Sequence, residues 1–194
     1  MPNTPIEQAD FVCLDTETSG LSPLMGGKIC EIALLSSRGG KRTGSYTTLI
    51  NPGMIMAPDV ISIHGITNQM VAASPRFEAV APALLNILQG SVIVCHNADF
   101  DMGFLESEFA QIGLKTPGSI VLDTLKFARC NGSFTRNRLG VIAKELGINT
   151  DGWHRAMADT VMTEKIFYYF LNKFKRHGAK TIGDLCDFQT KKCV

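Results

Sequence analysis

The stretch DFVCLDTE, residues 10–17, decides the fold, because it predicts a buried apolar strand that ends in acids. Asp15 and Glu17 stand two positions apart, so both side chains point to the same face of that strand. Two further segments of strand composition follow, KICEIALLSS and RTGSYTTLINP, and glycine-containing turns precede each of them. This spacing predicts three strands in an antiparallel run.

The rest of the chain alternates short apolar strands with helices. SVIVC and SIVLDT are predicted strands, and the segment MAPDVISIHGITNQMV (56–71) is predicted to be a loop. The predicted helices are PRFEAVAPALLNILQG, a helix within the stretch that starts at 96, TLKFARC, one within SFTRNRLGVIAKELGI, and a long one from about Arg155 to about Phe174. This order predicts an α/β fold, a mixed sheet with helices packed on it. We expect one domain over 8–176 and a short tail over 177–194 that adds one helix.

Composition limits the function classes. The chain has 194 residues, 45% of them hydrophobic, and a net charge of +1, so it is not a protein that holds nucleic acid mainly by charge. Its six cysteines form no CxxC pair, and Cys13, Cys30 and Cys95 lie in apolar runs, which predicts buried thiols in a reducing compartment. The first residues do not resemble a signal peptide and no apolar run has membrane-spanning length, so we expect a cytoplasmic protein.

The stretch HNADFDMGFLESEF, residues 96–109, contains two aspartates with different expected roles. On a helix, at about 100° per residue, Asp101 falls at the edge of the apolar stripe and Asp99 falls on the polar side. Asp99 also stands where a helix N-cap belongs. Asp101 is therefore the predicted inward acid, and an inward carboxylate needs a partner because an unpaired buried charge is costly. A metal ion would serve.

A third acidic position lies at the start of the last long helix. Asp159 aligns with the core stripe of that helix, and His154 precedes it by five residues. Alone, each acid could be a first-turn acid favoured by the helix dipole, and His154 could be a surface or capping residue. Together, four acids lie inward or at a strand end: Asp15, Glu17, Asp101 and Asp159.

Such a set of hard oxygen ligands suits Mg²⁺ or Mn²⁺. Four carboxylates can hold two such ions about 4 Å apart, an arrangement that serves in-line attack on phosphodiesters. One ion then lowers the pKa of the attacking water and the other stabilises the leaving oxygen. A neutral imidazole can take the proton of the water.

At these residues the sequence resembles a known family. FVCLDTETSGL, HNADFDMGFLESEF and HRAMADTVMTEKIF are similar to the three motifs of the DEDDh branch of DnaQ-like 3'–5' exonucleases, which includes the proofreading epsilon subunit of bacterial DNA polymerase III, RNase T and oligoribonuclease. The resemblance covers about residues 10–174. It implies an RNase H-like fold and two-metal hydrolysis that releases nucleoside monophosphates from a 3' end.

The resemblance also implies roles for single residues. Asp15, Glu17, Asp101 and Asp159 match the metal-binding acids of the family, and His154 matches its general base. Further residues are expected to meet the terminal nucleotide or to line the same cleft: Thr18, Leu21, His64, His96, Asn97, Phe100 and Phe104. Two positions depart from the usual pattern, Ser19 in place of threonine and Asp99 in place of a small uncharged residue.

Three functions compete at this point. The leading one is a Mg²⁺- or Mn²⁺-dependent 3'–5' exonuclease that acts on single-stranded or frayed DNA ends, with a proofreading or repair role. The second is a 3'–5' exoribonuclease, because nothing in the sequence selects the sugar. The third is a non-catalytic subunit that docks on a polymerase through Ile182, Leu185 and Phe188 of the tail. We favour instead a tail helix that packs on its own domain. For each function we expect a monomer or a homodimer, with a DNA polymerase subunit as a candidate partner.

Overall fold

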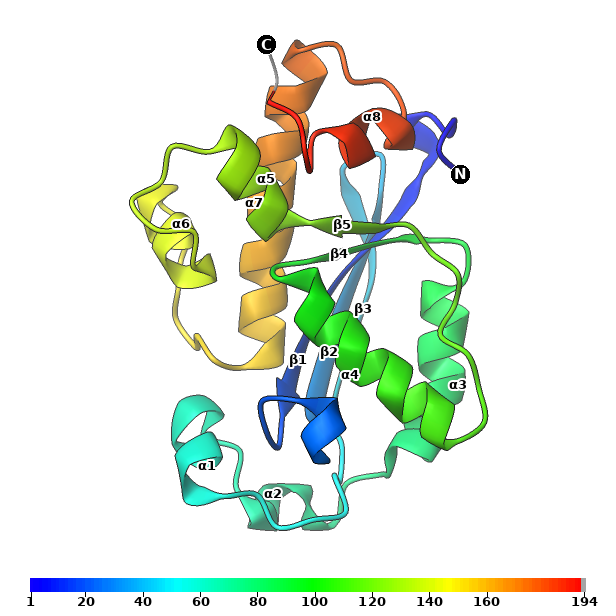
Figure 1. Ribbon diagram of the computed structural model, residues 1–194, viewed down its shortest axis with the longest axis vertical. Helices are drawn as coiled ribbons and strands as arrows, with labels where there is room; N and C mark the ends of the chain where they lie inside the picture. Colours follow the sequence, from blue (N-terminus) through cyan, green and yellow to red (C-terminus); the bar gives the residue numbers. More distant parts are fainter. Residues whose placement is uncertain (193–194) are drawn as a thin grey trace.

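The sheet is mixed, as the sequence predicts. A computed structural model describes residues 1–192, so Cys193 and Val194 of the expected tail lie outside the described part (Figure 1). Five strands lie in the order β3-β2-β1-β4-β5. The antiparallel part comprises β1 (Asp10–Thr18), β2 (Ile29–Arg38) and β3 (Lys41–Leu49). The two remaining strands, β4 (Val92–Cys95) and β5 (Val121–Asp123), extend the sheet in parallel with β1.

Helices cover both faces of the sheet. On one face, α3 (Phe77–Leu88) and α4 (Ala98–Gln111) pack against alternate residues of β1 such as Val12 and Leu14. The other face carries four helices: α5 (Thr124–Asn131), α6 (Leu139–Glu145), α7 (Ala156–Arg176) and α8 (Ile182–Asp187). Two single turns of 3-10 helix, η1 (Ile6–Gln8) and η2 (Pro23–Met25), flank β1. Each predicted strand and long helix is therefore present, with shifted ends.

The segment over 56–71 is not the loop that the sequence predicts. It contains α1 (Pro58–His64) and α2 (Asn68–Ala72). Pro58 opens α1 and a left-handed glycine ends it, whereas the Thr67 side chain accepts a hydrogen bond from the first turn of α2. Both helices are too short to show a helical period in the sequence, so local end signals determine them.

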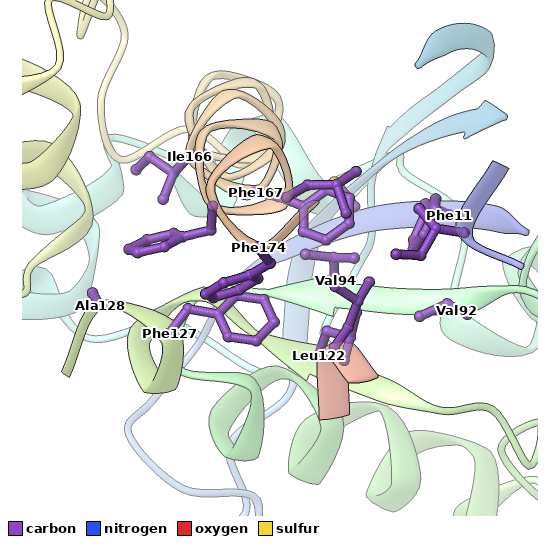
Figure 2. Packing of buried hydrophobic residues seen from close by; sticks show 14 of the residues in the cluster. Phe11, Val92, Val94, Leu122, Phe127, Ala128, Ile166, Phe167 and Phe174 are labelled. Atoms are coloured by element: carbon purple, nitrogen blue, oxygen red, sulfur yellow. The ribbon is translucent and has the colours of Figure 1, made fainter. Parts of the chain in front are cut away.

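The larger apolar core is built around helix α7. Its phenylalanines lie between the sheet and α5, as Figure 2 shows for Phe167 and Phe174 beside Phe11 and Phe127. The rings of Phe11 and Phe167 stand 4.9 Å apart, and those of Phe127 and Phe174 also 4.9 Å. Burying each such side chain stabilises the fold by about 1.5–3 kcal/mol. This packing holds the middle and the C-terminal part of α7 against the start of β1 and against α5.

The tail packs on its own domain. Ile182 and Leu185 of α8 are completely buried, and the ring of Phe188 stacks on that of Phe174 at 4.4 Å. The expectation that we favoured is confirmed, and the alternative in which Ile182 and Leu185 face a partner is wrong. Among residues 1–192, no helix combines the length and the apolar character that a membrane span requires.

Candidate active site

The last residues of β1 have no strand partner on the β4 side, and Asp101 forms its hydrogen bonds there. Strand β1 pairs with β4 only as far as Cys13, because β4 is short and the chain then turns into α4. The first turn of α4 brings Asp101 to the unpaired residues of β1, where its Oδ1 accepts from the backbone N–H of Thr16 at 2.9 Å and from the Thr16 hydroxyl at 2.7 Å. Asp101 is 3% exposed, so its predicted inward position is confirmed.

Asp99 is not the helix cap that the sequence predicts. Asn97 occupies the N-cap position with a left-handed backbone, φ 72°, and Asp99 is the second residue of α4. The side chain of Asp99 is 84% exposed and pairs with Lys126 at 3.4 Å. Its place on the polar side of the helix is as predicted, but its capping role is wrong. The turn at Asn97 lets α4 begin earlier than the aspartate-cap rule indicates.

Three of the four predicted acids come together at the end of β1. Asp15, Glu17 and Asp159 each place a carboxylate oxygen within 4.8 Å of the other two. Asp159 reaches this group from the first turn of α7, which packs across the face of the sheet to which Asp15 and Glu17 point. Asp101 lies outside this set of mutual distances, yet its charge is the second cause, after burial, that raises the pKa of Asp15.

Within residues 1–192, none of these four carboxylates forms an ion pair with a basic side chain. Burial, reinforced by the Asp159 charge, raises the pKa of Glu17 to about 8. Burial also raises the pKa of Asp159 and that of Asp101 to about 7, although hydrogen bonds from His154 and Thr16 oppose the shifts. The pKa of Asp15 rises well above its usual value. This oxygen-only donor set fits hard divalent cations, which would replace the protons.

His154 stands at the edge of this cluster in a strained backbone conformation. Its φ is 68°, in the left-handed region that non-glycine residues rarely adopt, and its backbone N–H donates to Asp159 Oδ1 at 3.2 Å. The imidazole is exposed and stacks on the Trp153 ring at 4.8 Å. Trp153 in turn lies against Gly140 of α6, where an added Cβ would stand 2.6 Å from the indole. The turn at His154 is therefore fixed by two contacts, the backbone hydrogen bond to Asp159 and the stacking of its ring on Trp153.

A fifth acid, Glu31, belongs to the site and was not predicted from the sequence. Glu31 is directly opposite Glu17 in the β1–β2 register and is 5% exposed. Its carboxylate accepts from Arg155 Nε at 3.1 Å, from Arg155 Nη2 at 2.6 Å and from the backbone N–H of Ala156 at 2.9 Å. It thereby fixes the first residues of α7 on β2. The available signal was an acid within the apolar run ICEIALL, which requires a buried partner.

The loop after β1 carries an exposed leucine. Leu21 is 82% exposed, and the hydroxyl of Thr18 donates to the Gly20 carbonyl at 2.7 Å. Ser19 closes the loop, because its backbone N–H donates to the Lys28 carbonyl at 2.7 Å and its Oγ accepts from the Lys28 N–H at 2.9 Å. The departure to serine therefore keeps the hydroxyl that closes the loop, and Leu21 is left free to meet a ligand.

The two histidines that were expected to line the cleft instead form hydrogen bonds within the protein. His64 is buried, its Nδ1 accepts from the backbone N–H of Ile66 at 2.9 Å, and burial lowers its pKa. His96 is half-buried, and burial lowers its pKa as well. Its Nε2 lies 3.0 Å from the Asn137 carbonyl, so the neutral ring donates there and accepts at Nδ1 from the Thr124 hydroxyl, 2.8 Å away. Neither ring has a nitrogen free for a substrate.

The remaining expected residues divide into two groups. Phe104 is 1% exposed, so the expectation that it lines the cleft is wrong; it packs in the core beneath Phe100, with the ring centroids 5.0 Å apart. Phe100 is half-buried and Asn97 is exposed, both at the start of α4. The buried positions of α4 recur every three or four residues and include Asp101, Phe104 and Glu108, so the helical period places Phe104 inward.

A mixed sheet with carboxylates gathered at the end of its central strand is the architecture of RNase H-like nucleases. The family model described as "Exonuclease" (RNase_T) matches residues 12–167, and the chain belongs to this exonuclease family. A 3'-5' exonuclease DinG from Bacillus subtilis (strain 168) is 35% identical over 176 residues, which cover 90% of this chain and 19% of the relative. A DNA polymerase III subunit epsilon-like protein from Rhodobacter capsulatus is 36% identical over 188 residues, 94% of this chain and 27% of the relative.

The chain thus spans between 19% and 27% of the length of these two relatives. Among solved structures, exonuclease X in complex with 5' overhanging duplex DNA superposes with a TM-score of 0.71 and 26% identity, covering 92% of this chain and 99% of the other. The Escherichia coli ExoI–ssDNA complex superposes with a TM-score of 0.77, covering 93% of this chain and 42% of the other, and at 21% identity it supports the fold alone.

Proposed function

We propose that this chain is a divalent-metal-dependent 3'–5' exonuclease that removes nucleoside 5'-monophosphates from the 3' end of single-stranded or frayed DNA. The observation that carries the proposal is the group of carboxylates from Asp15, Glu17 and Asp159, whose pKa values burial raises. A purely structural cluster would place a basic side chain among these acids. Instead, Arg155, whose charge lowers the pKa of Glu17, is paired with Glu31.

In this mechanism the four predicted acids, Asp15, Glu17, Asp101 and Asp159, hold two Mg²⁺ or Mn²⁺ ions. Bound ions of this kind lower the pKa of the attacking water and stabilise the leaving oxygen. Thr16 orients Asp101 through two hydrogen bonds before any ion is present. This preorganisation removes part of the cost of ordering a ligand.

His154 is the general base of the proposed reaction. Its exposed imidazole accepts the proton of the attacking water, while the left-handed turn and the hydrogen bond to Asp159 place it beside the acids. Leu21 and Phe100 would contact the terminal base and sugar, because exposed apolar and aromatic surfaces bind bases with little regard to sequence. Asn97, exposed at the start of α4, is the proposed polar contact of the same nucleotide.

The names of one relative and of one solved structure support the proposed direction of digestion and the choice of DNA. The DinG relative is named a 3'-5' exonuclease, and the exonuclease X structure contains DNA. These names favour a DNA 3' end. Association with a polymerase subunit, a proofreading role and a monomeric or dimeric state stay predictions.

The test is digestion of matched 5'-labelled DNA and RNA single strands with Mg²⁺, with Mn²⁺ and with EDTA. We expect a ladder that shortens from the 3' end of DNA only when metal is present. Asp15→Asn should abolish the ladder, whereas Asp99→Asn, which alters an exposed ion pair, serves as the matched control. Rapid trimming of RNA with DNA left intact would replace DNA by RNA as the substrate. If neither the DNA nor the RNA strand is cleaved with Mg²⁺ or Mn²⁺, the proposal that the chain is a nuclease is rejected.

A further inference from the structure

A hollow lined by arginines adjoins the start of α4, outside the acidic cluster. It has a volume of about 650 Å³ and lies between the turn that precedes α4, helix α5 and the segment that leads into α6. In Figure 1, α5, α6 and the start of α4 are drawn around the middle part of α7. Three arginines line it, Arg129, Arg136 and Arg138, with Leu125 and Leu139 as apolar contacts. Its size is in the range of sites that accommodate ligands of nucleotide dimensions.

The three arginines of this hollow are available for a ligand. Within residues 1–192, none of them forms an ion pair, and each is exposed. Cations on other elements near the acids are already engaged: Lys28 with Glu108, Lys126 with Asp99, and Arg155 with Glu31. Three like charges around one cavity repel one another, so their arrangement favours an anion.

The arginine segment is tied to the proposed substrate site. His96 connects the two, because its Nε2 donates to the carbonyl of Asn137, which stands between Arg136 and Arg138. His96 also immediately precedes Asn97, and both residues line the hollow. A strand that leaves the terminal nucleotide past Asn97 therefore enters the hollow directly.

We propose that this hollow binds the phosphates of the single strand on the 5' side of the terminal nucleotide. The proposal rests on the proposed function. It says where the part of the substrate strand that is not being cleaved would bind. The net charge of +1 provides little general attraction, and the acids repel a phosphodiester. Local arginines can supply the missing affinity, since guanidinium groups bind phosphate in a bidentate manner and stack on bases.

The test compares strands of two and twelve nucleotides. The triple variant Arg129→Gln, Arg136→Gln, Arg138→Gln should lower the ratio of kcat/KM on the twelve-nucleotide strand to kcat/KM on the dinucleotide at least tenfold, with Mn²⁺ present. The salt slope of log(kcat/KM) on the longer strand should also become shallower by about 2, the value for three lost phosphate contacts to a single strand. The corresponding triple lysine variant keeps the charge but loses the bidentate and stacking geometry, so its ratio should fall between those of the wild type and the glutamine variant.

The matched control removes the same charge elsewhere. Lys41, Lys115 and Lys165 are exposed and do not line the hollow, so their triple glutamine variant should keep the length ratio within about twofold. An equal ratio in the arginine and control variants would overturn the proposal.

A second readout separates this proposal from the proposed function. If the wild-type chain cleaves no strand, the proposed function fails, but fluorescence anisotropy of a labelled twelve-nucleotide DNA in Ca²⁺ still tests the hollow. A dissociation constant raised at least tenfold by the arginine-to-glutamine variant and less than threefold by the control supports the proposal. Equal effects of the two variants reject it.

Discussion

The carboxylates at the end of β1 differ in what holds them. Asp101 is fixed by the backbone and hydroxyl of Thr16, so its position does not depend on an ion. Glu31 is neutralised by Arg155 and therefore acts as a structural acid. Glu17, directly opposite Glu31 in the register, has a raised pKa and no such partner. Removing each of these groups should accordingly have a different consequence.

Asp101 and Asp99 provide the sharpest contrast. Asp101→Asn should lower kcat at least 100-fold, because an amide cannot replace a charged metal ligand, while Asp99→Asn should keep kcat within twofold. Steady-state cleavage of a 5'-labelled DNA strand measures both. Thermal unfolding provides the control, since Asp101→Asn should remain folded. An inactive Asp99→Asn beside an active Asp101→Asn would show that the face assignment of α4 is incorrect.

Glu31 is a positioning residue, and its effect can be separated from stability. Glu31→Gln should lower Tm by about 2–4 °C, the equivalent of about 1 kcal/mol for a chain of this size, and should lower kcat about tenfold with KM nearly unchanged. The kcat falls because Arg155 and the neighbouring His154 lose their anchor. The matched control is Glu164→Gln, which breaks the half-buried pair with Arg42.

The Glu164 variant should lose similar stability with kcat within twofold. Equal losses of kcat in the two variants would mean that Glu31 acts only through stability.

At the scale of elements, the strands and helices that could be predicted from the sequence are those with a long, regular pattern of apolar residues. Strand β1 and helix α7 have long apolar patterns, and both are present with small shifts of their ends. Helices α1 and α2 are too short to show a period and were expected to be a loop. The Glu31–Arg155 contact depends on the register between strands and on where α7 crosses them, which no local pattern specifies.

The packing of α6 against the turn before α7 predicts a further mutational effect. Gly140→Ala should displace Trp153, because an added Cβ would stand 2.6 Å from its ring, and His154 stacks on that ring. We expect kcat to fall about tenfold while Mn²⁺ affinity stays within about twofold, as measured by kinetics and calorimetry. Gly103→Ala on α4 is the control, since nothing lies within 4 Å of an added Cβ there.

In the Gly103 variant kcat should be unchanged, and stability should be equal or slightly higher because alanine favours helix. A fully active Gly140→Ala would show that the Trp153 contact does not position the base.

At the scale of the molecule, the N-terminal residues and the tail pack together on the larger apolar core. Pro5 forms a bridge with Thr181, and the Gln189 side chain accepts from the backbone N–H of Asp123 at the end of β5. The Pro5–Thr181 bridge lies next to the start of β1, whereas the buried acids lie at its end, at the same edge of the parallel strands as Asp123. Because these carboxylates are buried close together, the stability of the metal-free chain should depend on pH.

The direction of that dependence follows from the pKa values. Those of Glu17, Asp159 and Asp101 are about 8, 7 and 7 in the folded chain, and about 4 when unfolded. Between about pH 4 and 8 the unfolded chain therefore binds fewer protons than the folded one, so the free energy of unfolding falls as pH rises. Thermal unfolding in EDTA should show Tm at least about 4 °C lower at pH 8 than at pH 5.5.

The variant Asp15→Asn, Asp159→Asn should show a flatter pH profile, because two of the titrating groups are removed. A wild-type profile in EDTA that rises from pH 5.5 to 8 would contradict the raised pKa values.

The central claim is that the acids at the end of β1 form a centre for divalent ions, and calorimetric titration with Mn²⁺ at pH 6.5 tests it most directly. We predict two bound ions per chain, with protons released into the buffer as the raised carboxyl pKa values fall, and loss of this binding in the variant Asp15→Asn, Asp159→Asn. Absence of Mn²⁺ binding by the wild-type chain, or equal binding by that variant, would contradict the claim.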